Sequence, residues 1–195
     1  MYNTPFFHIV LEFLKQVGNS LSAQLQGDIR SGKATLEDQT LYIKKNFAGG
    51  GIINLITPTT ERIDGICSFD KNILQTGRVF VFDEISIGYA KDAALGKEGS
   101  LKYNIVAPAP LLNADFVIIQ NGKEVLRKSV ADLHNLAAGQ NVKDQFTTLK
   151  GLKFLTDAKE IKMQLVFPDG VVMDDTTDKH YIYVRLNGLQ TAIKS

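Results

Sequence analysis

The chain has 195 residues, of which 44% are hydrophobic, and its 22 basic residues nearly balance its 21 acidic ones. This length and composition suffice for one substantial core and are too small for two full domains, so we expect one domain with a helical arm. The near-neutral charge and the absence of a long lysine or arginine run exclude a protein built to neutralise nucleic-acid phosphates, so no direct nucleic-acid contact is expected.

Cysteine content and hydropathy indicate the compartment. The single Cys67 excludes an intramolecular disulfide framework, and the sequence has no Asn-x-Ser/Thr site, so a reducing compartment is expected. The first residues carry no positive segment and no clean cleavage site, which argues against a standard export signal. No stretch of 18 apolar residues is present. The sequence therefore predicts no membrane-spanning helix but leaves open a helix lying on a membrane surface.

An amphipathic helix with a wide apolar face is predicted at the N-terminus. Thr4 can cap it, and Pro5 fits its first position. Its apolar residues cover more than half of the circumference: Phe6, Phe7, Ile9, Val10, Leu11, Phe13, Leu14, Val17, Leu21 and Leu25. Such a face needs cover from the chain's own β-structure, from a neighbouring subunit or from a lipid surface. We expect it to exceed what the chain's own sheets can cover. The helix is expected to end near Gly27, before a linker over 28–32.

Short strands are predicted to follow, over residues 41–47, 52–56, 62–69, 78–89 and 101–106. The longest has an alternating pattern. It places Val79, Val81, Ile85, Ile87 and Tyr89 on one face, and Phe80, Phe82, Glu84, Ser86 and Gly88 on the other. Both faces are partly apolar, which indicates a central strand. Pro108 and Pro110 then predict an extended connection.

A β-hairpin is the clearest local pattern in the second half of the chain. Residues 116–120 and 123–127 flank Asn121 and Gly122, a pair that tolerates the positive φ angles of a type I′ turn. A short helix is predicted over 129–136, with Ser129 and Asp132 at capping-box positions. Further strands are expected over 146–150, 161–167, 171–173 and 180–186, the last with Tyr181 and Tyr183 opposite Ile182, Val184 and Leu186.

Eight to ten strands without alternating helices are typical of an antiparallel sandwich. The predicted fold is mainly β: an antiparallel β-sandwich of single jelly-roll type with an N-terminal amphipathic α-helix. We expect the helical arm and linker over residues 1–32 and the β-sandwich domain over residues 33–195.

Two segments are weak candidates for anion-binding loops. Residues 30–33, Arg-Ser-Gly-Lys, lack the earlier glycine, the following hydroxyl residue and the preceding strand that a phosphate-binding loop needs. The glycines at 49–51 could cradle an anion, but glycines between strands more often allow a tight turn. Neither segment predicts a nucleotide site.

Metal and nucleophile patterns are also incomplete. An acidic cluster, Asp169, Asp174, Asp175 and Asp178, suits calcium chemistry but matches no EF-hand, and a solvated loop is the alternative. His8, His134 and His180 are scattered, and Cys67 lies in an apolar pattern typical of a buried structural thiol. Asp83 and Glu84 are adjacent in a strand and so point to opposite faces. Tyr181 and Tyr183 could stack on a sugar, but packing fits them better. We therefore predict no catalytic residue, no metal site and no cofactor, and a protein that is not an enzyme.

The N-terminal apolar helix, the long strand from Gly77 to Tyr89 and the closing segment from Tyr181 to Leu189 carry a resemblance. Together they resemble, in layout over most of the chain, the capsid proteins of tailless, lipid-containing icosahedral bacterial viruses. In that family upright jelly-rolls build the shell, and N-terminal helices contact the internal membrane or neighbouring subunits. Its major shell proteins commonly have two jelly-rolls, whereas about 150 residues after Gly32 suffice for one. The resemblance thus implies a shell, penton or minor capsid protein.

The leading hypothesis is a structural virion protein: a self-assembling, homo-oligomeric capsid component of a bacteriophage, assembled in the host cytoplasm. Its expected partners are copies of itself and other capsid proteins, and an internal lipid membrane is left open. The expected interface residues are Phe6, Phe7, Val10, Phe13, Leu14 and Val17. The polar strip of the helix is not strongly basic, which favours a protein groove over anionic lipid. The alternative is a ligand- or glycan-binding β-sandwich module that uses loops such as 49–51 or 169–178.

Overall fold

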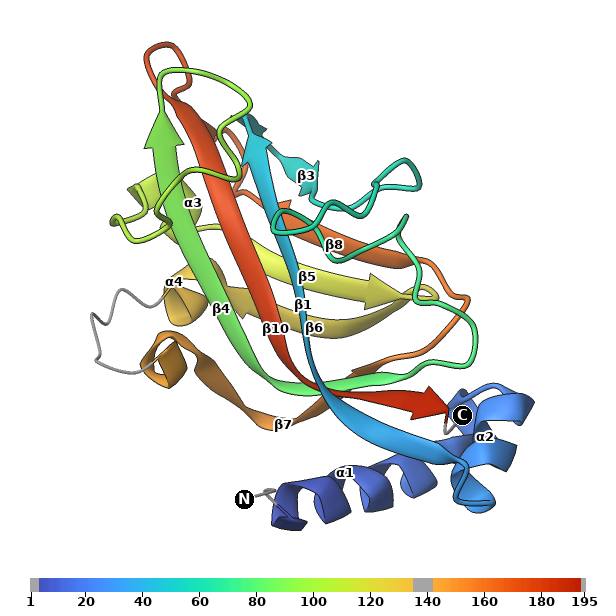
Figure 1. Cartoon of the computed structure of the whole chain (residues 1–195). Helices are drawn as coiled ribbons and strands as arrows, with labels where there is room; N and C mark the ends of the chain where they lie inside the picture. The colour runs from blue at the N-terminus through green and yellow to red at the C-terminus, as the bar shows by residue number, and fades with distance from the viewer. Residues whose placement is uncertain (1–3, 135–141, 194–195) are drawn as a thin grey trace.

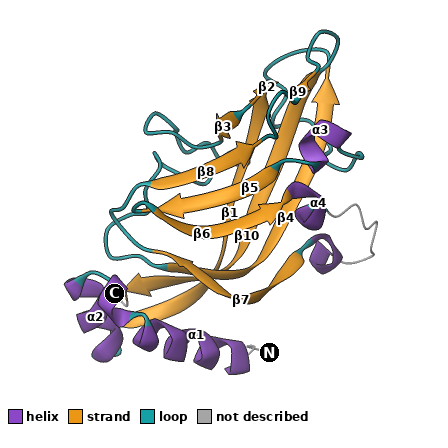
Figure 2. Cartoon of the chain, turned by 180° about the vertical axis from the view of Figure 1, so that it is seen from behind, coloured by secondary structure: helices purple, strands orange, loops and turns teal. Residues whose placement is uncertain are grey.

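The computed structural model describes residues 4–134 and 142–193 of the chain. The N-terminal segment forms α1 (Thr4–Gln16), the 3-10 helix η1 (Gly18–Ser20) and α2 (Ala23–Arg30). The strands are β1 (Ala34–Phe47), β2 (Gly49–Gly50), β3 (Ile52–Asn54), β4 (Phe80–Asp92), β5 (Asp115–Gln120), β6 (Lys123–Ser129), β7 (Thr147–Leu155), β8 (Ile161–Val166), β9 (Val172–Met173) and β10 (Lys179–Ile193). Three short helices lie between strands: α3 (Ala109–Leu112), α4 (Val130–Leu133) and η2 (Val142–Gln145). Figures 1 and 2 show α1 and α2 together at one end of the β-structure.

The strands form two four-stranded antiparallel sheets and one small ribbon. The first sheet has the order β1-β10-β4-β7, the second has the order β3-β8-β5-β6, and β2 pairs with β9. The pairs are nested along the chain: β1 with β10, β2 with β9, β3 with β8, β4 with β7 and β5 with β6. The chain is therefore one long antiparallel ribbon turned at the β5–β6 hairpin. Contacts of β10 with β4 and of β5 with β8 complete the sheets.

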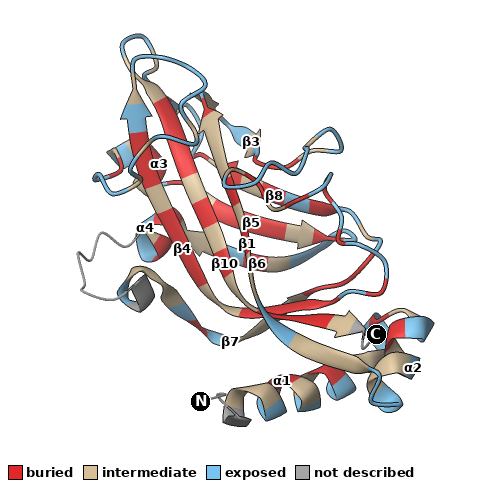
Figure 3. Cartoon of the chain, in the orientation of Figure 1, coloured by how far each residue is buried: buried red, intermediate tan, exposed pale blue. Residues whose placement is uncertain are grey.

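The main core lies between the two sheets. It is formed by large side chains from both: Phe80, Phe82, Ile85 and Ile87 of β4, Phe116 and Ile118 of β5, Met163 and Leu165 of β8, and Ile182, Val184 and Leu186 of β10. Figure 3 shows buried residues concentrated along these strands. The predicted class, mainly β with antiparallel sheets packed as a sandwich, is confirmed. The predicted placement of Ile182, Val184 and Leu186 on one face of the last strand is confirmed as well, and that face points toward the main core.

The predicted β5–β6 hairpin is also confirmed. Asn121 and Gly122 form its turn with φ angles of 52° and 73°, the left-handed values that a type I′ turn requires. Gln120 pairs with Lys123 across the turn. The short helix α4 starts after Ser129, whose hydroxyl accepts a hydrogen bond from the backbone N–H of Ala131. The expected end of that helix, at 135–136, lies outside the described residues.

A β-bulge at Asp83 changes the direction in which the side chains of β4 point. Against β10, Glu84 is opposite Asn187 and Phe82 is opposite Gly188, so Asp83 has no partner. The register against β7 shifts at the same place. A bulge reverses the alternation: Phe80, Phe82, Ile85, Ile87 and Tyr89 all face the main core, whereas Val79 and Val81 face the opposite side. The predicted division of this strand into two regular faces is therefore wrong.

Several predicted element boundaries are also wrong. The N-terminal helix ends at Gln16 and resumes as α2, which extends to Arg30 through most of the expected linker. Residues 62–69 contain only isolated bridges, between Cys67 and Ile43 or Ile63, and 101–106 form no strand. The prolines at 108 and 110 begin the short helix α3 instead of an extended connection. The first and last strands, β1 and β10, are longer than predicted because they pair with each other from Ala34–Ile193 to Phe47–His180.

Candidate functional site

The helical arm packs on the outer face of the β1-β10-β4-β7 sheet. Its buried side chains Val10, Leu14, Leu21 and Leu25 form a second, smaller core with Val79, Val81 and Leu189. The bulge at Asp83 makes this possible, since it turns Val79 and Val81 away from the main core. Phe13 also contacts Phe154 of β7 edge-on, with ring centroids 5.7 Å apart. The arm is thus an integral part of the folded chain (Figure 1).

The six predicted interface residues fall into two groups. Val10 and Leu14 are 0% and 1% exposed, so their apolar surface is covered within the chain itself. Phe6, Phe7, Phe13 and Val17 are half-buried and keep some surface toward the outside. Ile9, on the outer side of α1, is 57% exposed. The half-buried side chains Phe6, Phe7, Phe13 and Val17, which we call the flank of the arm, are therefore the part of the predicted interface that remains open to another molecule.

A groove lies between this flank and the β5–β6 hairpin. It has a volume of about 570 Å³, and its apolar floor is formed by Phe13, Val17, Val125, Leu152 and Phe154. A shallower hollow of about 410 Å³ adjoins it, shares Phe13 and Leu152, and is also lined by His8, Ile9, Glu12 and Gln16. We call the first of these the α1 groove. It brings together side chains from α1, β6 and β7 that are far apart in the sequence.

The rim of the α1 groove is positively charged. Lys123, Lys153 and Lys159 line it. The carboxylate at the rim, Glu124, already accepts a hydrogen bond from Arg127 Nε at 2.9 Å. In the described part of the chain, no carboxylate lies within 4 Å of the three lysine amino groups. The sequence analysis missed these lysines because only the folded chain brings the hairpin, β7 and the arm together.

The acidic segment predicted as a calcium candidate forms an exposed loop around β9, which we call the acidic loop (168–178). Asp174 accepts hydrogen bonds from the backbone and hydroxyl of Thr176, which lower its pKa. Asp178 pairs with Lys91 at 2.6 Å. The carboxylates of Asp169 and Asp175 form no salt bridge among the described residues, and Lys179 Nζ donates to the backbone carbonyl of Asp175 at 2.8 Å. No group of three or more His, Cys, Asp or Glu side chains is placed to hold a metal in the described ranges.

Two of the three histidines have defined structural contacts. His180 donates from Nε2 to the carbonyl of Asp174 at 2.7 Å, so its Nδ1 accepts the hydroxyl proton of Tyr89 at 2.6 Å. Burial raises the pKa of Tyr89 to about 12. His134 accepts from the backbone N–H of Ala107 through Nε2 and donates to the carbonyl of Ile87 through Nδ1. Both rings therefore act as hydrogen-bonding links between strands and loops.

The remaining site candidates from the sequence, Cys67, the glycines at 49–51 and residues 30–33, have structural roles. Cys67 is buried, as predicted, and burial raises the pKa of its thiol. Gly49 and Gly51 have φ angles of 79° and 71°, and Gly50 lies against the backbone of Val171, so the glycine run forms the short strand β2 in close backbone contact with the β9 segment. The Arg30–Lys33 segment ends α2 and leads into β1.

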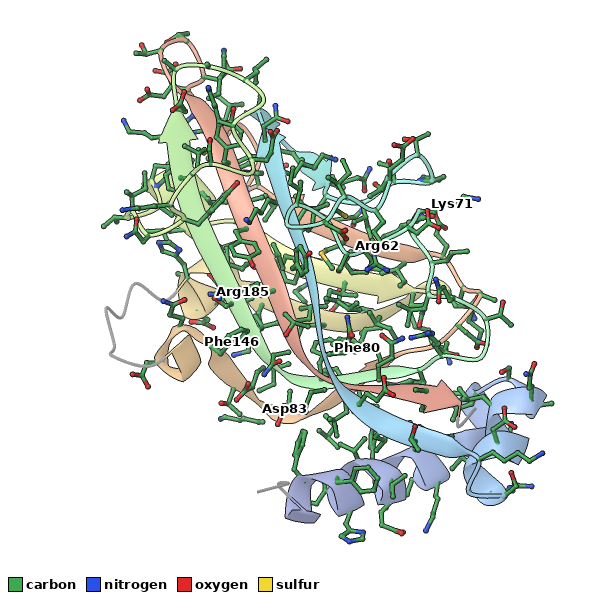
Figure 4. The ribbon with its side chains drawn as sticks, viewed as in Figure 1. Arg62, Lys71, Phe80, Asp83, Phe146 and Arg185 are labelled. Carbon is green, nitrogen blue, oxygen red and sulfur yellow. The ribbon has the colours of Figure 1, made fainter. Side chains whose placement is uncertain are left out.

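Arg185 of β10 lies on the outer face of the β1-β10-β4-β7 sheet. Its guanidinium lies between the rings of Phe146 and Tyr183, 4.7 Å and 5.0 Å from their centroids. It donates hydrogen bonds to Ser86 Oγ and Gln145 Oε1 at 2.8 Å and 2.9 Å, while its buried Nε has no partner among the described residues. Burial lowers its pKa. Figure 4 shows Arg185 beside Phe146. Aromatic rings thus replace a carboxylate as the stabilising partner.

A smaller pocket opens beside β1. It has a volume of about 320 Å³, an apolar floor that includes Leu41, Phe69 and Leu74, and a rim that includes Arg62, Lys71 and Arg78. Figure 4 shows Arg62 and Lys71 on the loops beside this strand. The lining combines apolar surface with cations, side-chain amides and the carboxylate of Asp70. Such a lining suits a small polar or anionic molecule.

No protein-family model matches the chain, and no curated protein matches it. Among the described residues, no helix combines the length and the apolar character needed to cross a membrane.

Proposed function

We propose that this chain is a single jelly-roll that self-assembles as a structural component of a virion capsid. The observation that carries the proposal is the nested strand pairing. In a jelly-roll, an antiparallel ribbon of eight strands is rolled so that the first strand pairs with the last and the innermost two form a hairpin. The orders β1-β10-β4-β7 and β3-β8-β5-β6 fit that arrangement, with β2 and β9 as a short extension of the ribbon.

Jelly-rolls serve as viral capsid domains, lectins and small-molecule pockets, so the fold alone does not distinguish among these functions. Large apolar side chains that remain exposed mark contact surfaces. Here they include Ile9 on the arm, and Ile52, Leu95, Val106 and Val172 in and near the connections between strands. They are spread around the molecule, which favours contacts with several neighbours in an assembly over one ligand site. The proposed partners are copies of this chain and other capsid proteins, and the proposed location is the virion.

Protein is favoured over lipid as the partner of the arm. The widest apolar face of α1 is already covered by the sheet, through Val10 and Leu14. Its outer side carries Glu12 and Lys15, which pair with each other at 2.6 Å, beside the single exposed Ile9. An interfacial helix needs a continuous apolar face directed at the membrane. The flank of the arm instead borders the α1 groove.

Self-assembly of the full chain tests the proposal. Sedimentation-velocity ultracentrifugation from micromolar to millimolar concentration is expected to show species larger than the monomer, and negative-stain electron microscopy is expected to show closed or regularly repeating particles. The same runs in 1 M salt separate apolar association, which persists, from purely charged association, which weakens. A chain that stays monomeric over the whole concentration range would rule out the proposal.

A second candidate function rests on the pocket beside β1. Its three cations and its amides favour a ligand-binding module that takes a small anionic or sugar-like molecule. Isothermal titration with inorganic phosphate, citrate and a set of oligosaccharides tests this reading. Saturable binding that the R62Q/R78Q variant loses, in a chain that remains monomeric, would favour the module over the capsid component.

A further inference from the structure

We propose that the α1 groove receives the acidic loop (168–178) of a second copy of this chain, in a head-to-tail contact. The proposal deepens the proposed function and rests on it, because it names the surfaces through which the chain self-associates. One surface is an apolar groove with a basic rim, and the other is an exposed loop with one apolar side chain and unpaired carboxylates.

The α1 groove has an apolar floor and a rim of lysines that form no salt bridge among the described residues. Its floor includes Phe13, Val17 and Leu152, which are only half-buried in the isolated chain. Lys123, Lys153 and Lys159 stand around it, and the rim carboxylate Glu124 is taken up by Arg127. Among the described residues, Lys159 Nζ donates only to the carbonyl oxygen of Ser20, at 3.5 Å. An occupant that fits must therefore carry an apolar side chain flanked by negative charges.

The acidic loop carries that combination. Val172 is 62% exposed. Asp169 and Asp175 lie three residues before and after it, and the carboxylate of neither forms a salt bridge among the described residues; Lys179 Nζ donates instead to the backbone carbonyl of Asp175, at 2.8 Å. The other two carboxylates of the loop are already used, since Asp174 accepts from Thr176 and Asp178 pairs with Lys91. The loop thus presents one apolar side chain between two available carboxylates.

The positions of the two surfaces exclude a contact within one molecule. The acidic loop joins β8 to β10 at one end of the sandwich, whereas α1 and the β5–β6 turn lie toward the other end (Figures 1 and 2). The groove of one copy can therefore take only the loop of another. Such a heterologous contact repeats from copy to copy and generates a ring, or an open array when the rotation does not close. This is the kind of contact that a shell component needs.

Charge reversal on each surface tests the contact. The groove variant carries K123E and K159E, and the loop variant carries D169K and D175K. Each variant alone places like charges together, so its self-association should weaken at least about tenfold relative to the unmodified chain. An equimolar mixture should recover association, because every reversed groove can then take a reversed loop, and every normal groove can take a normal loop. The matched control, K33E with K102E, changes two exposed lysines outside both surfaces and outside the pocket beside β1, and it should associate normally.

Sedimentation equilibrium at 150 mM salt gives the association constants, and far-ultraviolet circular dichroism confirms that each variant is folded. Recovery in the mixture supports the head-to-tail contact, and it also shows that both variants were correctly folded. Unweakened association of either variant, or a mixture as weak as its components, overturns it while leaving self-assembly through other surfaces intact. A monomeric unmodified chain, in contrast, overturns the proposed function itself, and the contact with it.

Discussion

Gly188 of β10 lies so close to Val81 of β4 that a Cβ atom on the glycine would overlap the carbonyl oxygen of Val81. The same atom would lie 2.7 Å from Cα of Phe82, so backbone rather than a flexible side chain occupies the space. This close approach occurs beside the bulge at Asp83. The bulge in turn lets β4 supply both cores. A residue without a side chain therefore allows the sheet and the arm to pack together.

The first prediction concerns this glycine. G188A should destabilise the fold by about 1–3 kcal/mol, since β4 and β10 must separate to admit a methyl group. Urea unfolding followed by circular dichroism measures the change in the free energy of unfolding. The control is G27A in α2, where nothing lies within 4 Å of the added Cβ and alanine is the better helix former. That variant should gain about 0.5–1 kcal/mol. Equal stability of the two variants would contradict the close approach.

The second prediction concerns the docking of the arm. Leu14 is 1% exposed in the smaller core, so L14A should cost about 2–5 kcal/mol. Ile9 lies on the same helix but is 57% exposed, and I9A should change stability by less than about 0.5 kcal/mol. The same urea experiment compares them. Similar effects of the two substitutions would mean that the arm is not packed on the sheet. Deletion of the whole arm is a poorer test because it uncovers Val79, Val81 and Leu189.

The third prediction concerns Cys67. Burial raises the pKa of its thiol, and the side chain donates a hydrogen bond to the carbonyl of Phe69 at 3.6 Å. The native protein at pH 8 should therefore react with an aromatic disulfide reagent at least about 100-fold more slowly than the protein in urea. Absorbance of the released thiolate follows both reactions. Comparable rates in the two conditions would show that the loop carrying Cys67 is open in solution.

The fourth prediction concerns the tyrosines. Burial raises the pKa of Tyr89 to about 12, and it raises the pKa values of Tyr103, Tyr181 and Tyr183 as well. Above pH 10 the unfolded chain loses phenolic protons that the native chain keeps, so stability should fall as pH rises from 10 through 12. Tyr89 alone would account for up to about 3 kcal/mol of this loss.

Absorbance at 295 nm during alkaline titration measures the late ionisation directly. Y89F should make the decline of stability with pH less steep, although it also removes the hydrogen bond to His180 and so lowers stability at every pH. A native titration curve that coincides with that of the urea-unfolded protein would contradict the burial of these rings.

Local patterns in the sequence were sufficient for parts of this structure. The Asn121-Gly122 turn, the alternation of Ile182, Val184 and Leu186, and the burial of Cys67 each depend on neighbours close in the chain. The bulge at Asp83 could not be read from them. Regular alternation continues through that residue in the sequence, and only pairing with both β10 and β7 shows that it is skipped.

The candidate site was predictable only in part. The apolar pattern of residues 6–25 indicated that the helix needs cover, but it could not show that Val79, Val81 and Leu189 supply it. Those residues become available only because the bulge changes their direction. The lysines of the α1 groove carry no local pattern at all, because Lys123 follows a turn and Lys159 precedes a strand. These lysines line a groove only because the arm lies beside them in the folded chain.

The nested pairing of strands also dictates the order in which the molecule can form. The β5–β6 turn closes over neighbouring residues, so it can appear early. The hydroxyl of Thr35, in contrast, bonds to the carbonyl of Ala192 across a separation of 157 residues. A chain leaving the ribosome therefore cannot insert its central strand, β10, between β1 and β4 until synthesis is almost finished. During that interval the facing edges of β1 and β4 stay open, so a chaperone that shields these edges should increase the yield of soluble protein.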